Sequence, residues 1–373
     1  MERYKGFACH PTVCPVGNDY HIIVPTNFEM ALSVLVDGEE YFNHSNGIVL
    51  TSCPIQQITV PAARLDAARE YTLCVRRVIK RMPYGTLTGR PVKITYPFRP
   101  IEKTEGIRLY QIADSHGVIE ESVAAAKRFG EPLDLLVLNG DIADSSENIE
   151  RITTTYRIAS AVTGGEIPCV ISRGNHDLRG AAAEHLAEYM PNQNGHSYYS
   201  FRVGCLWGLL VDCGEDKPDD HQEYGHMVCC HAFRREESAY IRQVIAQKQN
   251  EYEAEGVKYR LVISHAPFSW TDHKPFDIEQ ELFAEWCRLL KAEVKPHLML
   301  CGHIHNQIIS PVGGELDHKG QPCPVLVGTK VDRRARPPYY AGMGLTLQRD
   351  SAEVVFNTKD EIRLTQTVPY SAE

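Results

Sequence analysis

Five short clusters of aspartate, asparagine and histidine are the residues of this sequence best suited to bind metal ions. They are Asp114-Ser115-His116, Asn139-Gly140-Asp141-Ile142-Ala143-Asp144, Gly174-Asn175-His176-Asp177, Ser264-His265 and Gly302-His303-Ile304-His305. Carboxylate oxygens, amide oxygens and imidazole nitrogens bind divalent cations such as Mn, Fe or Zn. A carboxylate that bridges two such cations holds them ~3.5–4 Å apart, and this spacing can clamp a phosphoryl group. The residue types therefore favour a two-metal site that acts on phosphate esters.

The elements that must position these clusters alternate between strand and helix after Gly106. Apolar runs predict strands directly before the clusters, at residues 107–113, 133–138, 168–172, 259–264 and 297–301. Helices are predicted at residues 119–130, 147–161, 232–247 and 278–290, a β-hairpin at 198–211, and mostly β-structure at 307–354. In open α/β sheets the ligand crevice lies outside the carboxyl ends of the strands. We therefore expect the five clusters to meet at one edge of the fold.

The first hundred residues have a different pattern, in which short β-rich segments alternate with turns. Strands are predicted at residues 21–24, 32–36, 57–60, 71–75 and 92–96, with one short helix at 62–68. Clusters of Gly, Pro, Asn and Asp separate them, as is typical of a small β-sandwich. Residues 98–105 are predicted to be a linker, so residues 1–104 would form a domain of their own.

The five motifs, in this order, resemble those of the calcineurin-like metallophosphoesterase superfamily. The resemblance extends from Ile107 to the end of the chain. It implies an α/β fold in which residues 105–373 form two facing mixed β-sheets flanked by helices. The preceding sandwich, which would be fibronectin-like, resembles the layout of purple acid phosphatases.

The resemblance also implies two divalent cations that share the carboxylate of Asp141. One cation would be held by Asp114, His116, Asp141 and His305. The second would be held by Asp141, Asn175, His265 and His303. A hydroxide bridging the cations would attack phosphorus, and His176 would act as the general acid that protonates the leaving oxygen. Asp144 would orient His176 and favour its charged form.

At two places the sequence differs from the motifs of particular branches of this superfamily. Purple acid phosphatases have a tyrosine where this chain has Asp144, and they lack a histidine where it has His116. A coloured iron–tyrosinate site is therefore not expected. Ser/Thr protein phosphatases carry Val-Asp-Arg-Gly around the second motif, whereas this chain has Ala143-Asp144-Ser145-Ser146. Membership of that branch is not expected either.

Several of these residues have simpler interpretations. Asp144 could cap the helix that follows it, and Asp177 is interpreted as a structural hydrogen-bond acceptor. The acidic segment 212–227 is either a lid over the site or a solvated loop. The run Lys330, Arg333, Arg334 and Arg336 either grips a phosphate group or forms a solvated turn. Tyr339 and Tyr340 either stack on a base or pack within the fold.

Composition limits the classes of function. The chain has 373 residues and a net charge of −9, and it contains no apolar run of the ~20 residues that a membrane helix needs. We expect a cytoplasmic hydrolase without a membrane partner, whose substrate is a phosphomonoester or phosphodiester of modest size. A nuclease is one alternative, supported only by the arginine run and disfavoured by the acidic net charge. A non-catalytic binding protein with the same fold is the other. The sequence does not define the oligomeric state.

Overall fold

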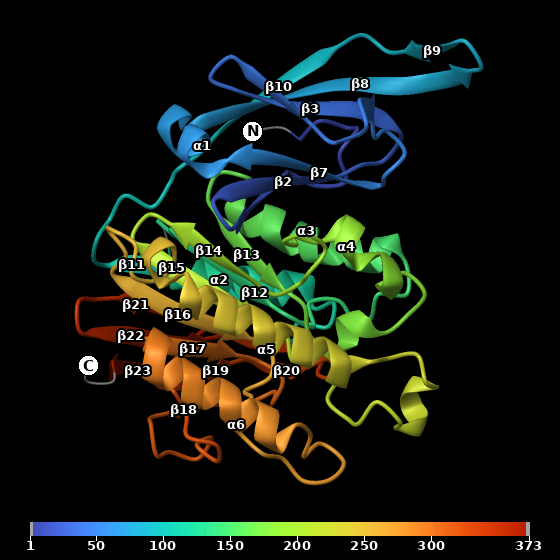
Figure 1. The fold of residues 1–373 in the computed structure, drawn as a ribbon. Helices are drawn as coiled ribbons and strands as arrows, with labels where there is room; N and C mark the ends of the chain where they lie inside the picture. The colour runs from blue at the N-terminus through green and yellow to red at the C-terminus, as the bar shows by residue number, and fades with distance from the viewer. Residues whose placement is uncertain (1–2, 131, 371–373) are drawn as a thin grey trace.

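The structure is a computed structural model that describes residues 3–130 and 132–370. Two antiparallel sheets near the N-terminus lie above a larger α/β part (Figure 1). The first sheet contains β1 (Thr12–Val16), β2 (Asp19–Pro25) and β7 (Ile55–Pro61). The second contains β3 (Met30–Val36), β4 (Glu39–Phe42), β8 (Glu70–Met82), β9 (Gly85–Thr88) and β10 (Val92–Pro97). The predicted all-β region is therefore present.

All five predicted strands of this region exist, and helix α1 (Ala62–Ala68) has the predicted bounds. Strands β1, β4 and β9 were not predicted. In β4 and β9 almost every residue is exposed, so neither strand has the apolar alternation that marks a half-buried strand. A further small hairpin, β5 (His44–Ser45) with β6 (Ile48–Val49), was also not predicted, because its strands are only two residues long.

The N-terminal sheets are packed directly onto the α/β part. One continuous apolar core contains residues of both, including Val13 and Leu73 from the first and Leu135 and Val170 from the second. The buried Tyr71 hydroxyl donates a hydrogen bond to the Gly165 carbonyl, with an oxygen–oxygen distance of 2.9 Å. The division into domains at residues 104 and 105 stays a prediction.

Two larger mixed sheets form the α/β part, as predicted. The seven-stranded sheet contains β11 (Ile107–Ile112), β12 (Leu135–Asn139), β13 (Cys169–Ser172), β20 (Lys330–Asp332), β21 (Tyr339–Leu347), β22 (Ser351–Asn357) and β23 (Ile362–Pro369). The six-stranded sheet contains β14 (Tyr199–Val203), β15 (Leu206–Val211), β16 (Tyr259–Ser264), β17 (Leu298–Cys301), β18 (Gln307–Ser310) and β19 (Val325–Gly328). Strand β23 extends the β-rich tail beyond its predicted end at residue 354.

Helices cover the outer face of each large sheet. Helices α2 (Ile119–Phe129) and α3 (Ile149–Thr163) share an apolar core with β11, β12 and β13. Helices α5 (Cys230–Ala246) and α6 (Gln280–Leu289) do the same on the six-stranded sheet, and α4 (Leu186–Tyr189) is a single turn. The N-cap of α3 is Asn148, whose side chain accepts a hydrogen bond from the Arg151 amide. Asp144 is therefore not the N-cap of this helix.

Buried amide side chains connect the two large sheets. The Gln111 side chain, on β11, donates to the Cys301 carbonyl of β17 over 2.8 Å. The Asn139 side chain, at the end of β12, donates to the Leu300 carbonyl over 3.0 Å and accepts from the Ser172 hydroxyl over 2.7 Å. Buried polar groups need such partners, so these bonds fix how the facing sheets meet.

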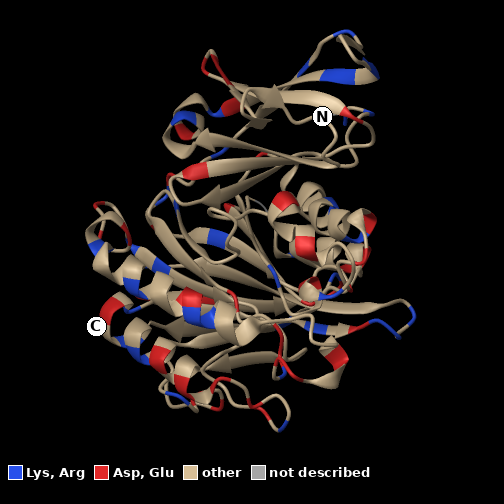
Figure 2. Cartoon of the chain, turned by 45° about the vertical axis from the view of Figure 1, so that its right-hand side comes forward, with Lys and Arg blue, Asp and Glu red and all other residues tan. Residues whose placement is uncertain are grey.

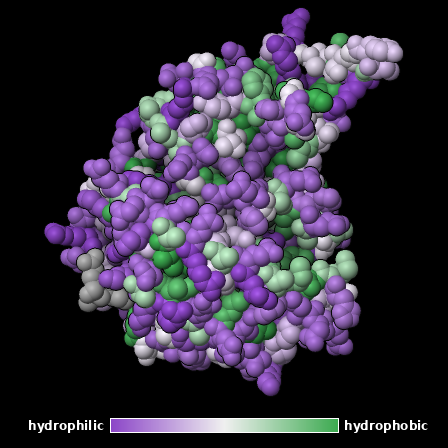
Figure 3. Space-filling model, in the orientation of Figure 1, coloured by the Kyte–Doolittle hydropathy of each residue, from purple (hydrophilic) through white to green (hydrophobic). Residues whose placement is uncertain are grey.

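Charge and hydropathy are unevenly distributed over the surface. The sequence from Tyr71 to Ile101 contains no acidic residue, and the β8–β9 hairpin carries several exposed cations (Figure 2). The face seen in Figure 3 is mostly hydrophilic, with scattered hydrophobic groups. Among the described residues, no helix combines the length and apolar character needed to cross a bilayer.

Candidate metal centre

The five predicted clusters follow five strands of the two large sheets. Asp114, Asp141 and Asn175 lie just beyond β11, β12 and β13, which are parallel neighbours in the seven-stranded sheet. His265 and His303 lie just beyond β16 and β17, which are parallel neighbours in the six-stranded sheet. Parallel strands present their carboxyl ends at one edge, so the two sheets bring all five loops together.

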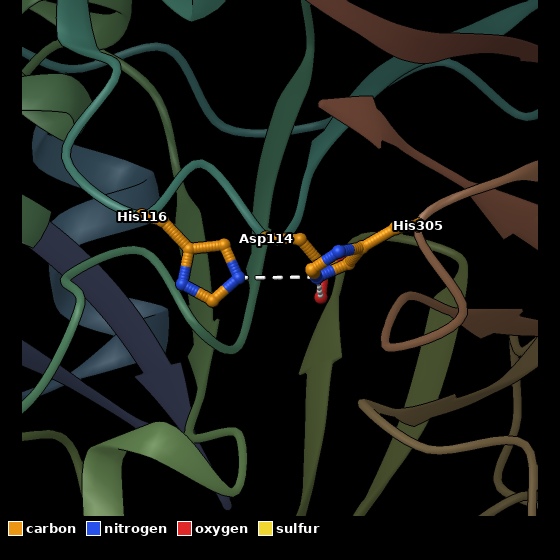
Figure 4. A group of neighbouring side chains, drawn as sticks. All are labelled: Asp114, His116 and His305. Carbon is orange, nitrogen blue, oxygen red and sulfur yellow. Dashed lines mark hydrogen bonds and ion pairs between the residues drawn. The ribbon is translucent and has the colours of Figure 1, made fainter. Parts of the chain in front are cut away.

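The predicted ligands of the first cation are in direct contact. The Nε2 atom of His305 lies 3.3 Å from Oδ1 of Asp114 and 3.1 Å from Nε2 of His116 (Figure 4). The Asp114 carboxylate is fully buried, and its two oxygens share the N–H that the His303 backbone donates, each over 3.0 Å. One ligand atom from each of Asp114, His116 and His305 lies within 4.8 Å of the other two.

The remaining predicted ligands adjoin this group. The Nε2 atom of His265 lies 3.3 Å from Oδ2 of Asp141 and 3.6 Å from Oδ1 of Asp114. The Asn175 side-chain amide lies 3.1 Å from Nδ1 of His303 and 3.3 Å from Oδ2 of Asp141. The structure thus brings all seven predicted ligands into one cluster. The division of the ligands between two cations stays a prediction.

The hydrogen bonds of His265 test whether this cluster fits a cation. Its Nδ1 atom donates to the Asn139 carbonyl over 2.7 Å, which directs Nε2 toward the carboxylates. That Nε2 atom is buried, and the nearest acceptors that it faces are the carboxylates of Asp141 and Asp114, 3.3 and 3.6 Å away. A ligating histidine characteristically has one nitrogen bound to a carbonyl and the other facing the metal. Two buried carboxylates beside a directed imidazole nitrogen fit a divalent cation.

The charges of the cluster support the same conclusion. Burial alone would lower the pKa of His265, but the carboxylates of Asp141 and Asp114 outweigh it and raise that pKa to about 10. Burial would raise the pKa of Asp141, yet His265 and its neighbours hold it well below its usual range. Burial lowers the pKa of His116 to about 4, so this imidazole is neutral at pH 7 and can act as a ligand. Without a metal ion, a proton on His265 offsets the negative charge of the Asp141 and Asp114 carboxylates. A bound cation would offset the same negative charge.

The backbone around the ligands is in an uncommon conformation. Five of the seven predicted ligands have positive φ angles between 44° and 68°, namely Asp114, His116, Asp141, His303 and His305. Only a few per cent of non-glycine residues adopt this left-handed conformation. Such residues persist where the surrounding structure enforces them, and they cluster at functional sites.

His176 lies at the open side of the cluster, with 29% of its side chain exposed. Its backbone amide donates to Oδ1 of Asp141 over 2.9 Å, and its Nε2 atom lies 4.0 Å from Oδ2 of the same residue. Its Nδ1 atom donates to the Asp144 backbone carbonyl over 3.1 Å. The Asp144 carboxylate lies 3.4 Å from Nδ1 of His116 and pairs with Arg333. The contact that orients His176 here is therefore with the Asp144 carbonyl.

Asp177 acts as the predicted hydrogen-bond acceptor. Its carboxylate accepts from the amides of Gly174 and Asp141, with nitrogen–oxygen distances of 2.7 and 3.2 Å. Burial and the nearby Asp141 charge raise the pKa of Asp177 to about 6. These bonds join two of the ligand-bearing loops.

The acidic segment 212–227 is anchored to the protein near Asn175. Arg179 forms two 2.8 Å hydrogen bonds with the Glu215 carboxylate, which is 1% exposed. The Asp216 carboxylate accepts from the Lys217 amine and the Tyr224 hydroxyl, both over 2.9 Å. The part of the segment that carries these residues is therefore not a freely solvated loop. Sequence reasoning missed Arg179 and Glu215, because partners 36 residues apart leave no local pattern.

The basic run and its aromatic neighbours are divided between surface and core. Arg334 and Arg336 are exposed, and only Arg333 of the run pairs with a residue of the cluster, namely Asp144. The Tyr340 hydroxyl is buried, accepts from the Ala113 amide over 3.2 Å and donates to the Ala113 carbonyl over 3.1 Å. Tyr340 therefore packs beneath the first ligand loop and is not free to stack on a base.

Comparisons with known proteins agree with this geometry. The sequence matches the calcineurin-like phosphoesterase family over residues 107–307, which is more than half of the chain, so the chain belongs to this family. A purple acid phosphatase, PPD1 from yellow lupin (Lupinus luteus) seeds, has a similar structure, with a TM-score of 0.56 and 12% identity. That comparison covers 96% of this chain and 74% of the lupin chain.

A structure of PhoD is similar as well, with a TM-score of 0.54 and 9% identity over 99% of this chain and 90% of that one. Identities this low show a shared fold only. The search of curated proteins found no match. The predicted relation to calcineurin-like enzymes, and the similarity in layout to purple acid phosphatases, are confirmed. The chain is thus a metallophosphoesterase, a class that acts on phosphate esters with the help of metal ions.

Proposed function

We propose that the protein hydrolyses a phosphomonoester or phosphodiester of modest size and that it uses two divalent cations, of Mn, Fe or Zn. The observation that carries this proposal is the Nε2 atom of His265, which the hydrogen bond of the neighbouring Nδ1 atom directs at the buried carboxylates of Asp114 and Asp141. The proposed ligand sets are Asp114, His116, Asp141 and His305 for one cation, and Asp141, Asn175, His265 and His303 for the other. When bound, such cations supply Lewis acidity to the phosphoryl group and lower the pKa of a water nucleophile.

His176 is the proposed general acid. Because its Nδ1–H group is bound to the Asp144 carbonyl, its Nε2 atom is left to carry and donate a proton toward the leaving oxygen. Its partial exposure lets solvent restore that proton after each turnover. Asp144 contributes through its carbonyl, and its carboxylate holds Arg333 at the rim of the cluster. A substrate phosphate oxygen could replace that carboxylate as the partner of Arg333.

Substitution of His176 tests this assignment. We expect His176→Ala to lower kcat by about 10²–10⁴-fold while leaving the metal content unchanged. The measurements are initial rates on a panel of phosphomonoesters and diesters, together with elemental analysis of the same samples. His44→Ala, in the exposed β5–β6 hairpin, is the matched control. Undetectable turnover of the wild type with Mn, Fe and Zn each restored after chelation would favour the non-catalytic alternative.

The nuclease alternative makes a different prediction. Binding to a nucleic-acid backbone releases counterions, so cleavage of oligonucleotides would decline steeply as salt increases. Hydrolysis of a small diester would change little over the same range. We propose the small ester as the substrate because only Arg333 of the basic run reaches the cluster. The cytoplasmic location is likewise a proposal, which cell fractionation would test.

A further inference from the structure

A hollow opens beside the ligands of the second proposed cation. Asn175 and His303 form one side of it, and the centres of water molecules have about 50 Å³ of space within it. Two segments form its other walls: residues 213–216, which follow β15, and residues 266–278, which follow β16 and His265. A group bound in this hollow would lie next to a phosphoryl group held at the cluster.

The wall formed by residues 266–278 is largely aromatic and apolar. Phe268 is buried, as is Phe283, which joins this wall from helix α6, and Trp270, Phe276 and Ile278 are partly exposed toward the hollow. Phe268 and Phe283 are in ring contact, with centroids 6.2 Å apart. Aromatic side chains recognise other planar rings by offset or edge-to-face contact. The wall therefore suits an aromatic ligand.

This wall is held in place from behind. The Lys319 amine donates to the Trp270 carbonyl over 2.6 Å and to the Thr271 hydroxyl over 2.5 Å. The His318 amide donates to the Ser269 carbonyl over 3.0 Å. The Trp270 segment is thus fixed by three hydrogen bonds from residues 318 and 319, so the wall is formed before a ligand arrives.

The charged residues of the hollow already have partners. Glu215 is paired with Arg179, and Asp216 with Lys217. The amine of Lys217 also lies 4.9 Å from the centroid of the Phe276 ring. Asp272, the third acid of the lining, accepts a 2.7 Å hydrogen bond from the His273 amide. Two of these three acids are thus paired with cations, and the described lining contains no lysine or arginine that could hold an anion, so the hollow favours an uncharged ligand.

We infer that this hollow binds an uncharged, planar aromatic group carried by the alcohol part of the phosphate ester. The inference rests on the proposed function, because it places the phosphoryl group at the metal cluster. The ring is that of an aryl alcohol or of a nucleoside base, which share this chemistry. Trp270 and Phe276 are the specificity-determining residues.

A kinetic experiment compares esters whose alcohols differ mainly in the ring. We expect kcat/KM for benzyl phosphate to exceed that for ethyl phosphate by about 10-fold or more, as for other apolar groups in a fitted pocket. Trp270→Ala and Phe276→Ala should abolish most of this ratio. Phe42→Ala, on the exposed strand β4, is the control that should retain it. A nucleoside 5′-monophosphate compared with ribose 5-phosphate tests the base as the source of the ring.

A binding experiment separates this inference from catalysis. The chain has three tryptophans, and Trp207 and Trp286 are 1% and 0% exposed, so Trp270 is the indole that a ligand can reach. Benzyl alcohol or adenosine should change the tryptophan fluorescence of the full-length protein in a saturable way. Ethanol and ribose should not, and the change should be lost in Trp270→Phe.

The two experiments have distinct outcomes. Saturable fluorescence changes without hydrolysis of any ester would support the hollow as a binding site and overturn the proposed function. Hydrolysis with equal kcat/KM for benzyl and ethyl phosphate, and no fluorescence change, would overturn the hollow and leave the function standing. Equal kcat/KM for cyclohexylmethyl and benzyl phosphate would overturn the requirement for an aromatic ring.

Discussion

Left-handed backbone recurs along this protein, and in two of the regions that contain it the reasons differ. In the N-terminal sheets it lies in exposed two-residue turns, Asp37-Gly38 between β3 and β4 and Asn46-Gly47 between β5 and β6. Asp-Gly and Asn-Gly are the dipeptides that favour such turns, so the local sequence explains the conformation. At the metal centre the same conformation occurs at aspartate and histidine residues of predicted ligand loops, most of them buried.

The two regions differ in what offsets the free-energy cost of a left-handed backbone conformation. Left-handed backbone costs a typical non-glycine residue about 1–2 kcal/mol, and less for glycine or asparagine. In the turns the residue type removes most of that cost. At the centre, hydrogen bonds between loops must offset it, such as those that Asp177 accepts from Gly174 and Asp141. Substitutions in the two regions should therefore have very different effects.

The largest effect is expected at the proposed shared ligand. Asp141→Asn keeps the shape of the side chain and tolerates the positive φ angle, but it removes the charge. Since substitutions that only support metal ligands cost 10–100-fold, we expect kcat/KM to fall by more than about 100-fold. Elemental analysis should show loss of metal from the same sample. Full metal content with unchanged activity would contradict the role of Asp141.

A close approach of two loops gives the next largest effect. A Cβ atom on Gly174 would lie 2.2 Å from Oδ1 of Asp141 and 2.7 Å from its backbone nitrogen. Gly174→Ala must therefore displace this ligand, and we expect unfolding to become about 1–3 kcal/mol more favourable. Activity should decline by at least about 10-fold. Chemical denaturation and kcat/KM, measured on one preparation, provide the check.

The turns provide the contrasting, smaller effect. Gly47 has a φ angle of 86°, and an added Cβ atom would have no atom within 4 Å. Gly47→Ala should therefore cost only about 1 kcal/mol of stability, from backbone strain alone. Activity and metal content should equal those of the wild type. A change in kcat/KM would show that the turn and the centre are coupled.

The smallest expected effect is a dependence of stability on pH that arises from Lys319, which binds the Trp270 wall of the hollow. Burial lowers the pKa of Lys319 to about 8, from 10.5 for the free side chain. The unfolded chain thus binds more protons between pH 8 and 10.5, so stability should rise with pH across this window. Because the amine is partly exposed, the gain should be about 1 kcal/mol or less. The midpoints of urea denaturation, measured at several pH values, would show this rise in stability. The Lys319→Met variant lacks the titrating amine, so its midpoint should not show this rise.

Much of the fold could be predicted from periodicity. The continuous apolar runs before Asp114, Asp141 and His265 marked buried strands, and their order placed the ligands at one edge. The exposed strands β4 and β9 have no such runs, and short β5 and β6 gave no signal. Such strands are defined by their neighbours in the sheet and by the turns between them.

The candidate site was predictable in its residue types and less so in its contacts. Places after strands marked the five clusters, the resemblance to calcineurin-like enzymes singled out the seven proposed ligands within them, and the structure brings these seven together. The bond from His176 to the Asp144 carbonyl could not be foreseen, because it depends on how the loop between β12 and α3 turns. The aromatic hollow was also missed, since it depends on loops that follow different strands.

The hydrogen bonds that the Gln111 and Asn139 side chains donate to the facing sheet have a consequence for the binding of a cation. They lie at the ends of the strands that bear the ligands, so the distance between loops of the two sheets is set when the chain folds. The entropy of assembling the coordination shell is thus lost during folding and not during capture of an ion. The affinity for a cation should therefore decline when these hydrogen bonds are removed, even though neither amide belongs to the proposed ligand sets.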